Sequence, residues 1–264
     1  MSDQNKNITQ PCDQCRVCNE NLFHLGVDLT NWDYIVALAG NPNTGKSTIF
    51  NALTGLRQHT GNWPGKTVTR AEGGFHYADK RYKLIDLPGT YSLLSASVDE
   101  EVARDFILFG RPHCTIVTVD STCLERNLNL VLQVLEITDK VVIALNLFDD
   151  ARRKGIEIDH RQLSRDLGVP VIPTVARTQE GLKELLAAVS EIVSSNIKTA
   201  PYRIKRTGPL QASLDEISGM IKDIYPGLPN VVWVAMRILE GDSRMREALL
   251  DGTLADLTDM RSHS

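Results

Sequence analysis

The chain of 264 residues is 42% hydrophobic and 23% charged, which are the proportions of a soluble globular protein. Its formal net charge of −4 argues against nucleic-acid binding by bulk charge, and no apolar run approaches the roughly 20 residues that cross a bilayer. The polar N-terminus has no secretory core, and five cysteines do not make a disulfide framework in a chain of this length. We therefore expect a cytosolic protein or the cytosolic part of a larger one.

Short apolar runs alternate with amphipathic stretches from residue 34 to residue 193, after a polar, aperiodic region at 1–32. This alternation predicts right-handed crossovers and a mainly parallel sheet covered by helices on both faces. The predicted strands are 34–39, two strands within 73–86 around a turn at 78–80, 114–120, 140–146 and 169–175. The predicted helices are 46–55, 97–110, 124–138, 159–168 and 181–193, and residues 56–70 are predicted to be a loop.

After Ser194 the alternation stops and a polar connector follows at 195–209. Beyond it, helical texture continues through 230–241 and 243–257. Apolar residues recur at helical spacing at Leu210, Leu214, Ile217, Ile221 and Ile224. We predict a polar, cysteine-containing extension at 1–32, an α/β domain at 33–195 and a small all-α domain at 196–264.

Residues Gly40–Ser47, with the sequence GNPNTGKS, match the phosphate-loop pattern G-x-x-x-x-G-K-[ST] at every fixed position. A predicted strand precedes them and a predicted helix follows, so that backbone N–H groups surround an anion at the start of the helix. Lys46 is expected to reach the β- and γ-phosphates, and Ser47 is expected to coordinate Mg²⁺. The residues expected to bind the phosphates are Gly40, Asn41, Asn43, Thr44, Gly45, Lys46, Ser47 and Thr48.

The sequence NLFD, from Asn146 to Asp149, stands at the end of a predicted strand. An Asn-x-x-Asp element there pairs the Asp carboxylate with the N1–H and exocyclic amine of guanine. Adenine offers no such pair of donors, so the carboxylate of Asp149 would be left unmatched. The base is therefore predicted to be guanine, with a strand-end turn as the structural alternative.

The sequence DLPG, from Asp86 to Gly89, closes another predicted strand. Asp86 is expected to hold the Mg²⁺ shell through a water, and the Gly89 N–H to sense the γ-phosphate. A threonine hydroxyl between this element and the phosphate loop should complete the Mg²⁺ shell, and Thr67 and Thr69 are the candidates. Together, these elements predict a GTPase of the translation-factor-like P-loop class.

Several longer runs resemble one family closely: GNPNTGKSTIFNALTG, HTGNWPGKTVTR, DLPGTYSLLSASVDEEVARDF and DSTCLERNLNLVLQVLE. They are similar to the N-terminal cytosolic part of the ferrous iron transport protein B family, FeoB. The likeness covers about residues 34–193, and the helical tail stands where that family has a small helical domain leading to its membrane pore. The resemblance implies a GTPase domain at 33–195 that regulates Fe²⁺ transport through a membrane domain not present in this chain.

The same resemblance implies a location at the cytoplasmic face of the inner or plasma membrane. The implied partners are GTP, the membrane-spanning domain and small cytosolic Feo proteins. Nucleic acid is not expected as a partner, and oligomerisation stays open.

The resemblance also assigns roles to single residues. Thr67 matches the Mg²⁺-binding threonine of switch I, the loop whose conformation follows the nucleotide. Asn43 matches the residue that helps to hold K⁺ beside the phosphates, with simple capping of the loop as the alternative. Thr90 follows Gly89 where many switches carry a water-positioning Gln, which implies slow hydrolysis stimulated by K⁺. The implied catalytic residues are Asn43, Lys46, Thr67 and Gly89.

The last base-recognition loop departs from the family pattern. The family commonly has a Ser-Ala pair, and here the matching run is PTVAR, with Val175 in place of the Ser. Ala176 keeps the position whose N–H would meet the guanine O6, but a hydroxyl that could brace the loop is missing. Leu147 would have to supply the apolar stem that a Lys often lays over the base.

Cysteines and aromatic residues outside these motifs leave alternatives open. Cys12, Cys15 and Cys18, with His24 nearby, have the spacing of a Zn²⁺ or iron–sulfur site, and free reduced thiols are the alternative. Cys114, inside a predicted strand, is expected to be core packing. Trp63, with His59 in the predicted switch I loop, is expected to be exposed, either as a contact that moves with the nucleotide or as mobile packing.

Two other functions compete with a transport GTPase. A stand-alone soluble GTPase in ribosome or tRNA maturation would share the phosphate loop and often Asn43, but usually adds a basic module. The strongest basic cluster in the tail is RIKR at 203–206. A binding switch with incidental hydrolysis is the weaker alternative.

Overall fold

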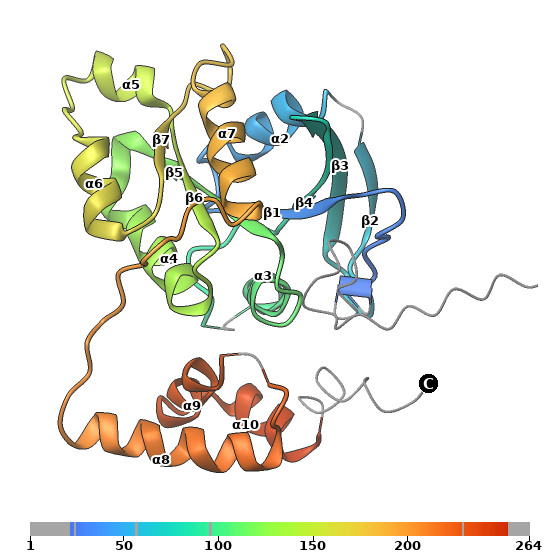
Figure 1. The fold of residues 1–264 in the computed structure, drawn as a ribbon, viewed down its shortest axis with the longest axis vertical. Helices are drawn as coiled ribbons and strands as arrows, with labels where there is room; N and C mark the ends of the chain where they lie inside the picture. The colour runs from blue at the N-terminus through green and yellow to red at the C-terminus, as the bar shows by residue number, and fades with distance from the viewer. Residues whose placement is uncertain (1–21, 24, 56–57, 95–96, 229, 253–264) are drawn as a thin grey trace, which may run out of the picture.

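A computed structural model describes residues 22, 23, 25–55, 58–94, 97–228 and 230–252 of the chain. The described residues form one seven-stranded sheet with the order β2-β3-β4-β1-β5-β6-β7 (Figure 1). The four pairs from β4 to β7 are parallel, and the two pairs that join β2, β3 and β4 are antiparallel. The predicted mainly parallel α/β fold with a helical tail is therefore confirmed. The strands are β1 Tyr34–Gly40, β2 Gln58–Asn62, β3 Thr69–Tyr77, β4 Lys80–Asp86, β5 Cys114–Asp120, β6 Val141–Asn146 and β7 Val171–Pro173.

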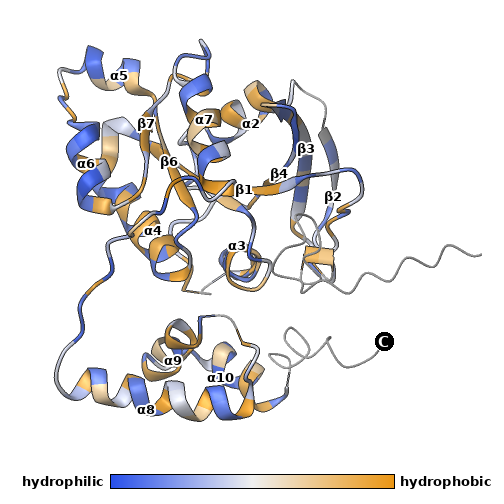
Figure 2. Ribbon diagram, in the orientation of Figure 1, coloured by the Kyte–Doolittle hydropathy of each residue, from blue (hydrophilic) through white to orange (hydrophobic). Residues whose placement is uncertain are grey.

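Helices cover both faces of the sheet because the central strands are apolar on both sides. Along β1, Ile35 and Ala37 join the core under α3 and α4, while Val36 and Leu38 join the core under α2 and α7. Figure 2 shows the hydrophobic residues concentrated along β1 and β6. The helices of this domain are α2 Lys46–Thr54, α3 Val98–Leu108, α4 Leu124–Ile137, α5 Phe148–Arg153, α6 His160–Leu167 and α7 Leu182–Val193, with a 3₁₀ turn η2 at Ser121–Cys123.

Parallel pairing brings the ends of several strands to one edge of the sheet. Leu38 of β1 is paired with Asp86 of β4, and Asp120 of β5 is paired with Asn146 of β6. Ligands of open α/β sheets bind at this carboxyl edge. The phosphate loop, which follows β1, therefore lies at the same edge as the motifs DLPG and NLFD.

Two elements differ from the prediction. The stretch predicted as a loop at 56–70 contains the strand β2, whose polar sequence QHTGN pairs antiparallel with β3. The sequence NLFD does not simply end a strand, because the helix α5 begins at Phe148 inside it. The predicted turn at 78–80 is a tight hairpin in which Ala78 and Asp79 both have positive φ, as a type I′ turn requires.

The described part of the predicted extension packs on the α/β domain. Leu22 and Val27 are fully buried in the core beside α3. The Arg70 guanidinium donates to the carbonyls of Leu25, at 2.8 Å, and Gly26, at 2.7 Å. Residues 22, 23 and 25–32 are therefore held against the α/β domain rather than projecting as a free arm, and two isolated apolar residues gave no periodicity that could predict this.

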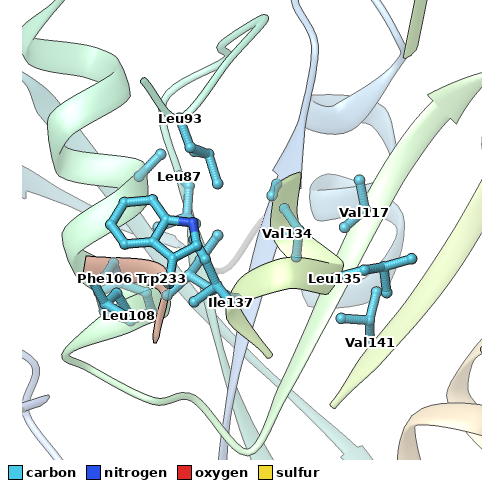
Figure 3. Packing of buried hydrophobic residues seen from close by; sticks show 14 of the residues in the cluster. Leu87, Leu93, Phe106, Leu108, Val117, Val134, Leu135, Ile137, Val141 and Trp233 are labelled. Atoms are coloured by element: carbon cyan, nitrogen blue, oxygen red, sulfur yellow. The ribbon is translucent and has the colours of Figure 1, made fainter. Parts of the chain in front are cut away.

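The tail forms three helices, α8 Pro209–Ile224, α9 Val231–Leu239 and α10 Ser243–Leu250. Helix α9 lies against the α/β domain, where Trp233 packs beside Leu93 (Figure 3). The Asn230 amide caps the end of α4 by donating to the carbonyls of Glu136, at 2.8 Å, and Ile137, at 3.0 Å. Among the described residues, no helix is both long and apolar enough to span a membrane.

Candidate functional site

The loop from Gly40 to Gly45 takes a shape that its glycines permit. A Cβ at Gly40 would lie 2.7 Å from the Thr118 carbonyl oxygen, and a Cβ at Gly45 would lie 2.3 Å from Nδ2 of Asn146. Gly45 also has φ of 79°, in the left-handed region that favours glycine. No side chain caps the helix α2 that begins at Lys46, so its first N–H groups are available to an anion.

Lys46 and Asp86 form an ion pair beneath this loop, and both side chains are largely buried. Burial raises the pKa of the Asp86 carboxyl, and the Lys46 ammonium opposes that rise. Ser47 stands exposed in the first turn of α2. A carboxylate and a hydroxyl beside an anion-binding loop are oxygen donors of the kind that Mg²⁺ prefers, so Asp86 and Ser47 fit this ion.

The sequence DLPG meets the phosphate loop. The Thr90 N–H donates to the Gly40 carbonyl at 3.3 Å, and a Cβ at Gly89 would lie 3.5 Å from Pro42. Thr67 lies exposed on the loop between β2 and β3, and Thr69 is the exposed first residue of β3. Among the described residues, no hydrogen bond joins Thr67 to Ser47 or Asp86. The structure thus brings Gly89 to the phosphate loop, while Thr67 is exposed on the loop that leads into β3.

Other polar residues of the phosphate loop differ in exposure. Asn43 is exposed with φ of 66°, so its side chain is accessible at the loop surface, and Thr48 is exposed on α2. Asn41 is buried, and its side-chain amide has no hydrogen-bond partner among the described residues. The Thr44 hydroxyl donates to the Asn41 carbonyl at 2.9 Å and closes the turn.

The expectation of an exposed tryptophan in switch I is wrong. Trp63 is only 3% exposed, and its ring packs edge-on against Phe106 of α3 at 5.3 Å between centroids. The Arg70 guanidinium lies over the same ring at 5.2 Å. This tryptophan is therefore an anchor that fixes the start of the loop before Thr67, while His59 in β2 is exposed.

Asn146 joins the phosphate loop to the base-recognition loops. Its side chain is buried, and Nδ2 donates to the Thr44 carbonyl at 2.9 Å. Its Oδ1 accepts from the Ala176 N–H at 3.1 Å and from the Thr174 hydroxyl at 3.4 Å. The Ser121 hydroxyl donates to the Asn146 carbonyl at 2.6 Å. Sequence reasoning placed Asn146 at the base but missed this bracing role, and it missed Ser121 altogether.

The remaining residues of the base end lie in two segments, 147–149 and 175–177. Leu147 has φ of 57° and precedes α5, which carries Asp149. The Arg177 guanidinium lies 2.6 Å from Oδ2 of Asp149. Val175 and Ala176 are buried, and the Ala176 N–H that was expected to meet guanine donates to Asn146 instead. Arg177 was missed, although its position directly after Ala176 in PTVAR was a usable signal.

The cysteine predictions divide into two groups. Cys12, Cys15, Cys18 and His24 lie outside the described residues. Within the described residues, no group of three or more His, Cys, Asp or Glu side chains could hold a metal ion. Cys114 is fully buried and its burial raises the pKa of the thiol to about 12, which confirms that it is core packing.

The fold and this site define a class of protein. A strand, a glycine-shaped phosphate loop and a helix stand beside a Lys–Asp ion pair, and the parallel strand β6 ends at Asn146 on the same edge, just before the helix α5 that carries Asp149. This arrangement is the G domain of a P-loop GTPase.

The family model described as Ferrous iron transport protein B matches residues 34–189, and the chain therefore belongs to this family. The Fe(2+) transporter FeoB of Shigella flexneri is 41% identical over 233 residues, which are 84% of this chain and 30% of that protein. A fusion of Fe(2+) transport protein A with FeoB from Porphyromonas gingivalis is 37% identical over 249 residues, 92% of this chain and 29% of the fusion. The chain thus spans about 30% of the length of these relatives.

Solved structures of the same family are also similar. The cytosolic domain of the T. maritima FeoB iron transporter has been solved in a GDP form and a GMPPNP form. Both match with a TM-score of 0.76 and 37% identity, over 83% of this chain and 85% of that chain.

Proposed function

We propose that this chain binds GTP and hydrolyses it to GDP and phosphate, and that this cycle regulates Fe²⁺ transport through a membrane domain outside the chain. The observation that carries the proposal is Asn146, whose buried amide contacts both the phosphate loop and the base loop, three residues before Asp149. A site organised in this way suits a guanine nucleotide with its phosphates in the loop. The GDP and GMPPNP forms of the T. maritima relative support it.

The phosphate end neutralises the charge of the triphosphate. The backbone N–H groups of the loop bind the phosphate oxygens, and Lys46 turns from Asp86 toward the β- and γ-phosphates. Ser47, Thr67 and Asp86 are the residues that would hold Mg²⁺. When bound, that ion supplies positive charge to the β- and γ-phosphate oxygens. Thr67, exposed on the loop between β2 and β3, would supply the third oxygen.

Hydrolysis by this chain is slow and depends on a monovalent cation. Thr90 occupies the position where a Gln would orient the attacking water, and its N–H is already bonded to the Gly40 carbonyl. Asn43 is exposed on the loop, where its amide oxygen can help to bind K⁺ near the β- and γ-phosphates. The Gly89 N–H faces the γ-phosphate and reports its presence to the residues that follow.

The base end selects guanine. Asp149 accepts from the N1–H and the exocyclic amine, and Leu147 covers the ring with apolar surface. Val175 and Ala176 line the position of the guanine O6.

A packed route leads from Gly89 to the helical tail. Leu93, four residues further along the chain, is held by Gln133 of α4, whose Oε1 accepts from the Leu93 N–H at 2.6 Å. Leu93 also packs beside Trp233 of α9 (Figure 3). A change of conformation after Gly89 therefore pushes directly on α9. We take this contact as the route toward the membrane domain, at the cytoplasmic face of the membrane. The P. gingivalis fusion supports small Feo proteins as further partners.

The proposal is tested by GTPase rates of the purified chain in K⁺ and Na⁺ buffers, with wild type and Asn43→Ala compared. We expect K⁺ to raise the wild-type rate roughly tenfold or more over Na⁺, and Asn43→Ala to remove most of that difference. Equal rates in both buffers would exclude the potassium site but not the GTPase activity. The absence of hydrolysis under both conditions would exclude the enzymatic function. RNA that copurifies with the chain would favour ribosome or tRNA maturation, which family membership disfavours.

A further inference from the structure

Two ion pairs connect the segment 147–153 with the loop 174–181 at the base end of the site. Arg177 contacts Oδ2 of Asp149 at 2.6 Å, and Arg152 contacts Glu180 at 3.2 Å. Both arginines are exposed and lie on the surface of the same two segments. Arg152 also lies over the Phe148 ring at 4.8 Å, but only Arg177 contacts the carboxylate that reads the base in the proposed function.

Val175 leaves the base loop without a side-chain donor at that position. A hydroxyl at this position would be a neutral donor close to the base loop, but the Val175 side chain has no polar atom and is buried. Among the described residues, Arg177 is the partner that the structure gives to the Asp149 side chain. Arg177, two residues further along the loop, thus supplies a side-chain donor in a loop where position 175 has none.

The Arg177 contact is compatible with a bound base. Each carboxylate oxygen has two acceptor positions, so one bond to Oδ2 leaves Oδ1 and the second position of Oδ2 for guanine. The side chain of Arg177 is 68% exposed and that of Asp149 is 26% exposed, so the guanidinium approaches from the solvent side. Its charge-assisted bond restricts the rotation of the carboxylate.

The backbone beside Arg177 is itself held. The Ala176 N–H is bonded to Asn146 and the Val175 N–H donates to the Glu180 carbonyl at 2.9 Å. Arg177 therefore projects from a fixed segment and can define a direction for its partner. If the backbone of Arg177 were mobile, the ion pair would not fix the orientation of the Asp149 carboxylate.

From this geometry we infer that Arg177 is a positioning residue for guanine recognition, which holds the Asp149 carboxylate in the orientation that pairs with N1–H and the exocyclic amine. The inference rests on the proposed GTP binding. It adds to guanine recognition a residue outside the motif NLFD. It also gives the loop a side-chain donor although Val175 stands in place of Ser.

The test measures the affinity of the full chain for GDP and for IDP, which lacks the exocyclic amine. The proteins are wild type, Arg177→Ala, the matched control Arg152→Ala and the double variant Val175→Ser/Arg177→Ala. We expect Arg177→Ala to weaken GDP binding roughly two- to fivefold and to lower the preference for GDP over IDP by a similar factor. Arg152→Ala should bind like wild type, and the serine of the double variant should restore part of the loss.

Three outcomes would overturn the inference. Unchanged or tighter GDP binding by Arg177→Ala would mean that the arginine is neutral or competes with the base. An equal loss in Arg152→Ala would mean that any link between the two segments suffices. If the double variant binds GDP as weakly as Arg177→Ala does, Arg177 does not compensate for a hydroxyl absent at position 175. If wild type itself fails to bind GDP, the proposed function fails, which is a separate and recognisable result.

Discussion

The two ends of the candidate nucleotide site are built by different means. The phosphate end depends on backbone shape, because Gly40 and Gly45 occupy places where a Cβ would collide with neighbouring strands or loops. The base end depends on side chains, because Asn146 and Arg177 hold the segments that carry Ala176 and Asp149. The ends touch where Gly45 lies against Asn146. A local motif therefore identifies the phosphate end, whereas the contacts of the base end depend on residues that are distant in the sequence.

The largest effect should come from Lys46→Ala, which removes the cation of the phosphate end. We expect GTP affinity to fall roughly 100-fold or more, because the β- and γ-phosphates lose their charged partner. The fold should persist, since burial raises the pKa of the Asp86 carboxyl and the loss of the opposing Lys46 ammonium raises it further, which lowers the cost of leaving this carboxyl unpaired. Binding of a fluorescent GTP analogue and the unfolding temperature give the two readouts.

The exposed Lys154 provides the control, because Lys154→Ala removes the same charge away from the loop. Equal losses of affinity in the two variants would assign the effect to net charge and contradict the role of Lys46.

Asp149→Asn should change the base end without weakening the phosphate end. An amide offers a donor where the carboxylate accepted, so GTP affinity should fall roughly 100-fold while xanthosine triphosphate gains affinity. Competition between the two nucleotides measures the exchange. Unaltered GTP binding would show that Asp149 does not read the base, whatever the phosphate loop does.

Asn146→Ala tests the contact between the two ends. It leaves the buried Thr44 carbonyl and Ala176 N–H without their partner, so the free energy of unfolding should fall by about 2–4 kcal/mol. Urea denaturation measures this loss, and the exposed Asn196→Ala is the control. A change smaller than that of the control would show that the two ends are held independently.

The same contrast explains what could be predicted from the sequence. The strand β1, the phosphate loop and the helix α2 after it follow from local patterns: an apolar run, glycines at fixed spacing and a helix start. The strand β2 could not be predicted, because its polar sequence becomes a strand only when the edge of β3 is beside it. The burial of Trp63 likewise depends on Phe106 and Arg70, which are distant in sequence.

At the base end, the sequence identified Asn146 and Asp149 but not their connections. The bonds from Asn146 to Thr44 and Ala176 join residues about 100 and 30 positions apart, so no local pattern reports them. Arg177 was visible beside Ala176, but its contact with Asp149 depends on how α5 is placed.

Isothermal titration calorimetry of the purified chain with GTP and with ATP, in Mg²⁺ buffer, tests the central claim most directly. We expect saturable binding of GTP with one site per chain and ATP binding at least roughly 100-fold weaker, because adenine cannot pair with Asp149. Equal affinity for the two nucleotides, or heat from neither, would contradict it.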